Sequence, residues 1–162
     1  MREERLFCDG WMFHRGDIKP PPPRHKMFSY QSAKTERYQM GPASPCHYVT
    51  DGTQFPTGEK EYTSEDWEQV TLPHDYLAGD GYDPACSAAL GFCKYDNGWY
   101  VKRFDVPAGD EGKRLTLLFE GVTGHATVML NGCLMKHNFC GYTPFEVDIT
   151  DNVYFDRENI LA

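Results

Sequence analysis

The sequence lacks a long apolar run and is poor in basic residues. Its 162 residues carry 16 lysines and arginines against 24 aspartates and glutamates, which gives a net charge of −8. Because this field repels phosphate backbones and anionic lipid, nucleic acid is not an expected partner. No stretch reaches the roughly 20 consecutive apolar residues of a membrane helix, and no apolar signal core follows the first residues. We therefore expect a cytoplasmic protein with no membrane partner.

The cysteines form no C-x-x-C pair. An even number, at positions 8, 46, 86, 93, 133 and 140, would suit a disulfide framework in a small secreted chain. The length of the chain and the missing signal core favour free, buried thiols instead.

Metal-ligand spacing is also scarce. Cys133, His137 and Cys140 could be a zinc half-site, because thiolate and imidazole suit zinc. The alternative places both cysteines on or near a hairpin without a metal, and the missing C-x-x-C favours it. Five histidines have no second ligand at metal spacing, which predicts surface or packing roles and neither metal nor cofactor: His14, His25, His47, His125 and His137.

Amphipathic helices are almost absent, and short alternating segments take their place. Residues 6–17 indicate a first strand kinked at Asp9-Gly10, and residues 18–66 show no sustained period and indicate loop. Strand patterns follow at 67–73, 99–107, 113–122 and 125–130. Asn131-Gly132 is a strong signal for a type I′ hairpin turn. The pattern predicts an all-β jelly roll or sandwich.

No catalytic motif is present. The sequence has no G-x-S-x-G elbow, phosphate-binding glycine loop or His-Glu-x-x-His, and no carboxylate pair stands out. Aromatic faces can stack on sugar rings. Four aromatics in alternating strands are nevertheless predicted to be buried in the core: Trp11, Trp67, Trp99 and Phe104.

A family resemblance rests on seven ordered motifs. They are DWEQVTLPHDY (66–76), GWYVKRF (98–104), FEGV (119–122), VMLNG (128–132), GYTPF (141–145), DIT (148–150) and NILA (159–162), preceded by GWMFHRGD (10–17). Together they resemble the N-terminal sugar-binding domain of glycoside hydrolase family 2, the β-galactosidase and β-glucuronidase family. The resemblance runs from about residue 6 to the last residue, and 18–66 is its weakest part.

The resemblance implies a jelly-roll domain over residues 1–162 with a loop-rich insertion at 18–66. In the family this domain precedes an immunoglobulin-like domain and a (β/α)₈ barrel, and the barrel holds the catalytic glutamates. It implies a fragment of a retaining β-glycosidase of β-galactosidase type, inactive alone, whose partners are a carbohydrate and these two domains. The last strand is expected to be cut short at Asn159–Ala162. The unpaired edge would favour a homo-oligomer.

The resemblance places candidate substrate contacts at His74, Asp75 and Tyr76, in a loop that runs to Asn97. Asp75 could accept a hydrogen bond from a sugar hydroxyl. The favoured alternative has Asp75 capping a turn and His74 bonded to backbone. Two rival functions stay open, a stand-alone carbohydrate-binding module and a structural module without a ligand.

Overall fold

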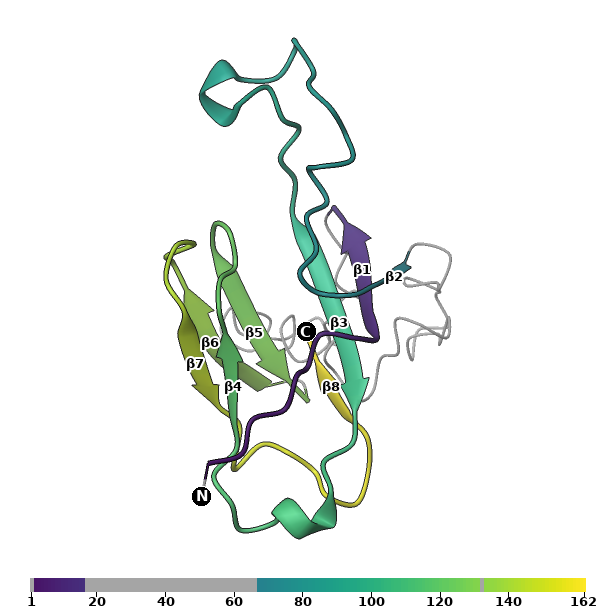
Figure 1. Ribbon diagram of the computed structural model, residues 1–162, viewed down its shortest axis with the longest axis vertical. Coiled ribbons are helices and arrows are strands. Elements are labelled where there is room, and N and C mark those ends of the chain that lie inside the picture. Colours follow the sequence, from purple (N-terminus) through teal and green to yellow (C-terminus); the bar gives the residue numbers. More distant parts are fainter. Residues whose placement is uncertain (1, 17–66, 132) are drawn as a thin grey trace, which may run out of the picture.

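The structure is a computed structural model that describes residues 2–16, 67–131 and 133–162 (Figure 1). Short strands dominate these residues, and no described helix is long and apolar enough to cross a membrane. In chain order the elements are β1 (Trp11–Arg15), β2 (Glu68–Val70), η2 (Ala88–Leu90), β3 (Gly98–Phe104), η3 (Ala108–Asp110), β4 (Thr116–Phe119), β5 (Ala126–Leu130), β6 (Cys133–Asn138), β7 (Phe145–Asp148) and β8 (Asn159–Leu161).

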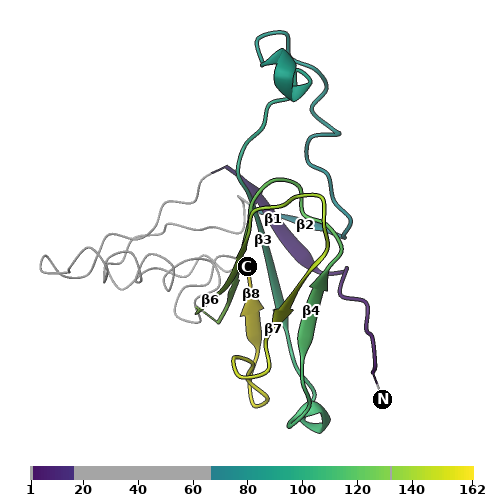
Figure 2. The same cartoon turned by 90° about the vertical axis from the view of Figure 1, so that its left-hand side faces the viewer.

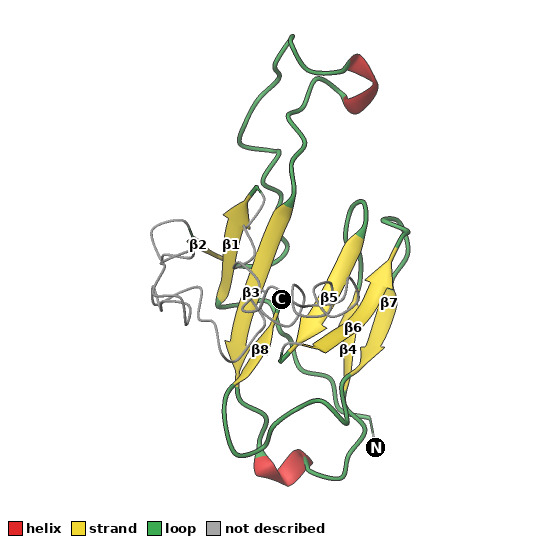
Figure 3. Cartoon of the chain, turned by 180° about the vertical axis from the view of Figure 1, so that it is seen from behind, coloured by secondary structure: helices red, strands yellow, loops and turns green. Residues whose placement is uncertain are grey.

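The described strands form two antiparallel sheets. One has the order β2-β1-β3-β8-β5-β6, and the other pairs β4 with β7. Seen from behind in Figure 3, nearly all regular structure is strand. The predicted all-β sandwich is confirmed, and the expected loop at 18–66 lies outside the described residues.

Alternation along the strands builds the core between the sheets. In β7, Phe145 and Val147 are buried while Glu146 and Asp148 face solvent. The ring of Phe145 stacks on Phe119 of β4 at 4.7 Å. The buried cluster also takes side chains from the large sheet and the final loop: Trp11, Val128, Leu130, Ile149, Val153 and Leu161. Burial of this apolar surface is the main stabilising term of the fold.

A second cluster lies on the other face of the large sheet. It contains Trp67, Val101, Met129 and Ile160, with Trp99 packed against it. Trp11 and Trp67 are 5% and 7% exposed, as befits core residues. Trp99 and Phe104 are half-buried rather than buried. Both differ from the expectation because they lie near the ends of β3, Trp99 as its second residue and Phe104 as its last, where neighbouring elements cover less of each ring.

The final strand lies in the middle of the large sheet. Leu161 of β8 pairs with Lys102 of β3 on one side and with Leu130 of β5 on the other. Met129 and Ala162 exchange both backbone hydrogen bonds, at 2.8 and 2.9 Å. Asn159–Ala162 thus joins two halves of the sheet, whereas the sequence predicted a final strand that is cut short and leaves an unpaired edge.

The β5–β6 hairpin turns at the predicted position. Leu130 pairs with Cys133, and Asn131 between them has a positive φ of 51°. Asparagine tolerates this left-handed conformation better than most residues. The other turn residue, Gly132, lies outside the described residues.

Two buried asparagines tie this hairpin to β8. Asn131 Nδ2 donates to Asn159 Oδ1 at 2.9 Å, and Asn131 Oδ1 accepts from the amide of Ile160 at 2.9 Å. Asn159 is fully buried, and its amide group also bonds the backbone N–H and C=O of Tyr154, at 2.8 and 2.9 Å. The two side chains thus provide hydrogen-bond partners for the backbone groups of Tyr154 and for the amide of Ile160.

Candidate functional site

An arm of residues 77–97 projects from one end of the sandwich. In Figures 1 and 2 it rises well beyond both sheets before it returns to β3, with η2 near its tip. Part of the loop that the sequence suggested for substrate contact is therefore a separate projection.

Internal hydrogen bonds give the arm a framework of its own. The amide of Asp83 donates to Phe92 O at 2.9 Å, and the amide of Phe92 donates to Ser87 O at 3.1 Å. Gly91 and Phe92 both have positive φ, at 66° and 59°, and Gly91 N also bonds Ala88 O. This is the reversal that commonly ends a helix, so η2 turns back within a few residues.

Arg15, at the end of β1, holds the base of the arm. One guanidinium nitrogen forms an ion pair with Asp80, and the other donates to Lys94 O at 2.6 Å. The guanidinium also lies 5.1 Å from the ring centre of Tyr76, a favourable cation–π distance. The hydrogen bond to Asp80 raises the pKa of Arg15 above its ordinary value, so it stays charged. One side chain thus joins both stems of the arm to the large sheet.

Two further hydrogen bonds close the base. The hydroxyl of Tyr76 donates to Asp96 O at 2.6 Å, and the amide of Gly16 donates to Asn97 O at 2.7 Å. The arm therefore leaves the sheet in a fixed direction.

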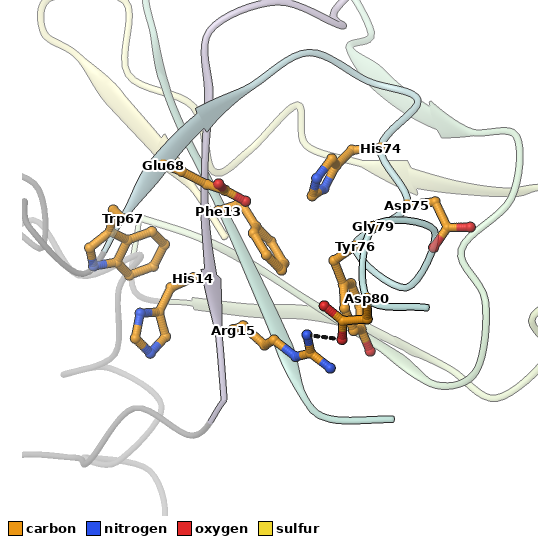
Figure 4. Close-up of a pocket in the computed structure, with 10 residues that line it drawn as sticks. All are labelled: Phe13, His14, Arg15, Trp67, Glu68, His74, Asp75, Tyr76, Gly79 and Asp80. Atoms are coloured by element: carbon orange, nitrogen blue, oxygen red, sulfur yellow. Dashed lines mark hydrogen bonds and ion pairs between the residues drawn. The ribbon is translucent and has the colours of Figure 1, made fainter. Parts of the chain in front are cut away.

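A hollow of about 580 Å³ lies beside this base (Figure 4). It is lined by Phe13, His14, Arg15, Trp67, Glu68, His74, Asp75, Tyr76, Gly79 and Asp80. The ring of Phe13 stacks on Tyr76 at 5.4 Å and meets the ring of His74 at 4.8 Å. An aromatic floor with carboxylates at its rim suits a polyhydroxylated ligand.

The three predicted contact residues all line this hollow, but they have structural partners. Asp75 Oδ1 accepts from the amide of Leu77 at 2.9 Å, which is the turn-capping role of the favoured alternative. His74 Nδ1 lies 2.9 Å from the hydroxyl of Tyr100, so its partner is a side chain and not the backbone. Tyr76 uses its hydroxyl on Asp96. Burial, with the nearby negative charges of Asp75 and Glu68, raises the pKa of Tyr100 to about 12, so its phenol stays protonated.

Sequence patterns missed Arg15, Asp80 and Glu68. Arg15 and Asp80 are 65 residues apart in sequence, and only the pairing of β1 with β3 brings them together. The GWMFHRGD motif contains Arg15, but nothing in it indicates a clamp.

The cysteines of the described residues are free thiols, at positions 8, 86, 93, 133 and 140. The prediction that they are buried is wrong for all five, because Cys8, Cys86 and Cys93 are half-buried in or beside loops, while Cys133 opens β6 and Cys140 follows its end, both exposed. Within the described ranges no group of three or more histidines, cysteines and acidic residues is placed to hold a metal ion.

No family model matches the chain. It is 32% identical over 109 residues to a β-glucuronidase of Formosa agariphila, covering 62% of the chain and 11% of that protein. It is 31% identical over 117 residues to the β-galactosidase BoGH2A of Bacteroides ovatus, covering 71% of the chain and 14% of that protein. The fold matches a glycosyl hydrolase family 2 member from Bacteroides cellulosilyticus with a TM-score of 0.63 and 28% identity, over 96% of this chain and 16% of that one.

The chain is a homologue of glycoside hydrolase family 2 β-glycosidases.

The relatives include enzymes of two substrate types. Both β-galactosidases and β-glucuronidases match, so the comparisons do not separate a galactoside from a glucuronide. The chain spans only 11% and 14% of the lengths of the Formosa and Bacteroides ovatus enzymes. What the family comparison shows is a β-sandwich that forms a small part of much larger enzymes.

Proposed function

We propose that this chain is the non-catalytic N-terminal sugar-binding domain of a retaining β-glycosidase that removes terminal β-linked sugars. In this proposal the arm of residues 77–97 and the hollow at its base help to shape a sugar site completed by a barrel domain. The observation that carries the proposal is that the arm projects beyond both sheets while its base is fixed by the contacts of Arg15 and Tyr76.

Exposed apolar side chains on the arm support a role in contact. Tyr82 is 83% exposed, Leu90 50%, Phe92 43% and Tyr95 49%. Apolar side chains gathered on one projecting element indicate a surface that meets a partner or a ligand. Tyrosine faces also suit the C–H face of a sugar ring.

The acidic groups of the hollow support a binding role over a catalytic one. Retaining glycosidases need two carboxyl groups free to act as acid and nucleophile. Here Asp80 is held by Arg15, and Asp75 caps the turn at Leu77. Both carboxylates serve the architecture of the site.

Charge favours a neutral sugar over a uronic acid. Glu68, Asp75 and Asp80 line the hollow, and the guanidinium of Arg15 is paired with Asp80. A carboxylate-bearing sugar would meet like charges there, at an energetic cost. We therefore propose a β-galactoside as the substrate class of the whole enzyme.

The chain alone is expected to show no glycosidase activity, because two of the three carboxylates that line the hollow, Asp75 and Asp80, have structural partners and are not free to act as acid and nucleophile. The measurement is release of nitrophenol from nitrophenyl β-galactoside and nitrophenyl β-glucuronide at high protein concentration. A parallel purification from cells without the gene controls for host glycosidases. Turnover that follows the chain through purification and exceeds this control would contradict the proposal.

A further inference from the structure

Two imidazoles meet on the outer face of the β5–β6 hairpin. The ring centres of His125 and His137 lie 6.3 Å apart, and both side chains are exposed. We propose that they form a binding site for a divalent metal ion of the class that prefers imidazole, such as Cu²⁺, Ni²⁺ or Zn²⁺.

Strand register creates the pair. Thr127 of β5 lies opposite His137 of β6, and Ala126 lies opposite Asn138. Residues two apart on a strand share a face, so His125 is the diagonal neighbour of His137 on the side away from the core. The two histidines are 12 positions apart in sequence, which is why their spacing shows no metal motif.

The distance between the rings allows a shared ion after a side-chain rotation. Metal–nitrogen bonds to histidine are about 2.0–2.1 Å, so two rings that bind one ion at an angle of about 90–110° have centres about 4.5–5.2 Å apart. The ring centres of His125 and His137 are 6.3 Å apart. Because both side chains are exposed, their rotation can bring the rings closer together.

A neighbouring hydroxyl orients one ligand. Thr127 Oγ1 lies 2.7 Å from His137 Nδ1. If Nδ1–H donates to this hydroxyl, the lone pair of Nε2 is left for a metal, and such partners are typical of metal-binding histidines. Phe139 packs beside both rings, 5.4 Å from His125 and 4.4 Å from His137, and limits their movement.

The surrounding loops are closely packed. A Cβ built at Gly141 would lie 2.5 Å from the backbone nitrogen of Gly124, so only glycine allows the two loops to approach. Asn138 Nδ2 also donates to Cys140 O at 2.6 Å. The imidazole pair therefore stands on a fixed scaffold, in contact with solvent.

The pair would supply two ligands, and water would complete the coordination. No group of three or more ligating side chains occurs among the described residues, so the site is an open one. An open site of this kind binds reversibly, and it can accept an imidazole, carboxylate or hydroxyl group from a second molecule as a further ligand.

The test is a titration of the tag-free chain with Ni²⁺ or Cu²⁺, followed by calorimetry and by broadening of amide signals in NMR spectra. The parent for all variants carries Cys133→Ser and Cys140→Ser, which removes exposed thiol ligands. We expect one ion per chain, with broadening centred on residues 125–127 and 137–139. His125→Gln and His137→Gln should each weaken binding at least about tenfold.

His14→Gln is the matched control, because it removes an imidazole from β1, which lies three strands from β5 in the large sheet. Its affinity should equal that of the parent. Absence of saturable binding to the parent, or an affinity equal to the parent's in either histidine variant, would overturn the proposal. Amide spectra confirm that each variant is folded.

Discussion

Replacing Asn159 with alanine is expected to lower the free energy of unfolding by about 3–4 kcal/mol, since each buried polar group left unpaired costs about 1–3 kcal/mol. The side chain is fully buried, and it bonds both backbone groups of Tyr154 together with Asn131 Nδ2. Alanine would leave the N–H and C=O of Tyr154 without these partners. Denaturant unfolding measured by tryptophan fluorescence gives the difference.

Two matched variants separate hydrogen bonding from side-chain volume. Asn159→Asp keeps the shape but cannot donate to Tyr154 O, so it should also destabilise. Asn152→Ala changes an asparagine whose backbone carbonyl, rather than its side chain, bonds Asn131, and its effect should stay within about 0.5 kcal/mol. Equal midpoints for Asn159→Ala and the parent chain would show that the asparagine network does not stabilise β8.

Replacing Trp11 with alanine is expected to cost about 3–5 kcal/mol, the range for large aromatic truncations in a core. Trp11 is 5% exposed and belongs to the cluster between the sheets. Its Nε1 donates to Phe7 O at 2.8 Å, and its ring meets that of Phe7 at 6.0 Å. Loss of the ring would also release the segment that precedes β1.

Trp99→Ala is the comparison for Trp11→Ala. Trp99 is half-buried and packs against the cluster on the opposite face of the large sheet, so its truncation should cost less. Thermal and denaturant unfolding of both variants gives the order. An equal or larger loss of unfolding free energy for Trp99→Ala would contradict the expectation that the cluster between the sheets contributes more to stability.

Local patterns in the sequence predicted the sandwich well because its strands alternate. β7 alternates buried and exposed residues along its whole length, and Asn131 takes the positive φ expected of the turn. Such features depend on residues close together in the chain. They gave the fold class and the position of the hairpin.

Features that depend on sheet order were not predicted. That β8 lies between β3 and β5 follows from strand pairing across more than fifty residues on one side. Trp99 alternates as a core residue would, but alternation does not say how far neighbouring elements cover a residue near the end of a strand.

In the candidate site, too, local motifs were visible in the sequence, whereas contacts between distant residues were not. The sequence predicted substrate contacts at His74, Asp75 and Tyr76, and all three residues line the hollow, while the contacts themselves stay a prediction. Arg15 was missed because its partners, Asp80 and Lys94, are distant in sequence. The pairing of His125 with His137 likewise needed the register of a hairpin.

The central claim is that this domain supplies one part of a sugar site which another domain completes. Its most direct test is an NMR titration of the chain with galactose, lactose and glucuronate. We predict binding no tighter than about millimolar, or roughly −4 kcal/mol, with shifts centred on the hollow and on residues 77–97 and weakest for glucuronate. Micromolar binding, or shifts centred on exposed aromatics elsewhere such as Tyr142, would instead identify a stand-alone carbohydrate-binding module and contradict the account.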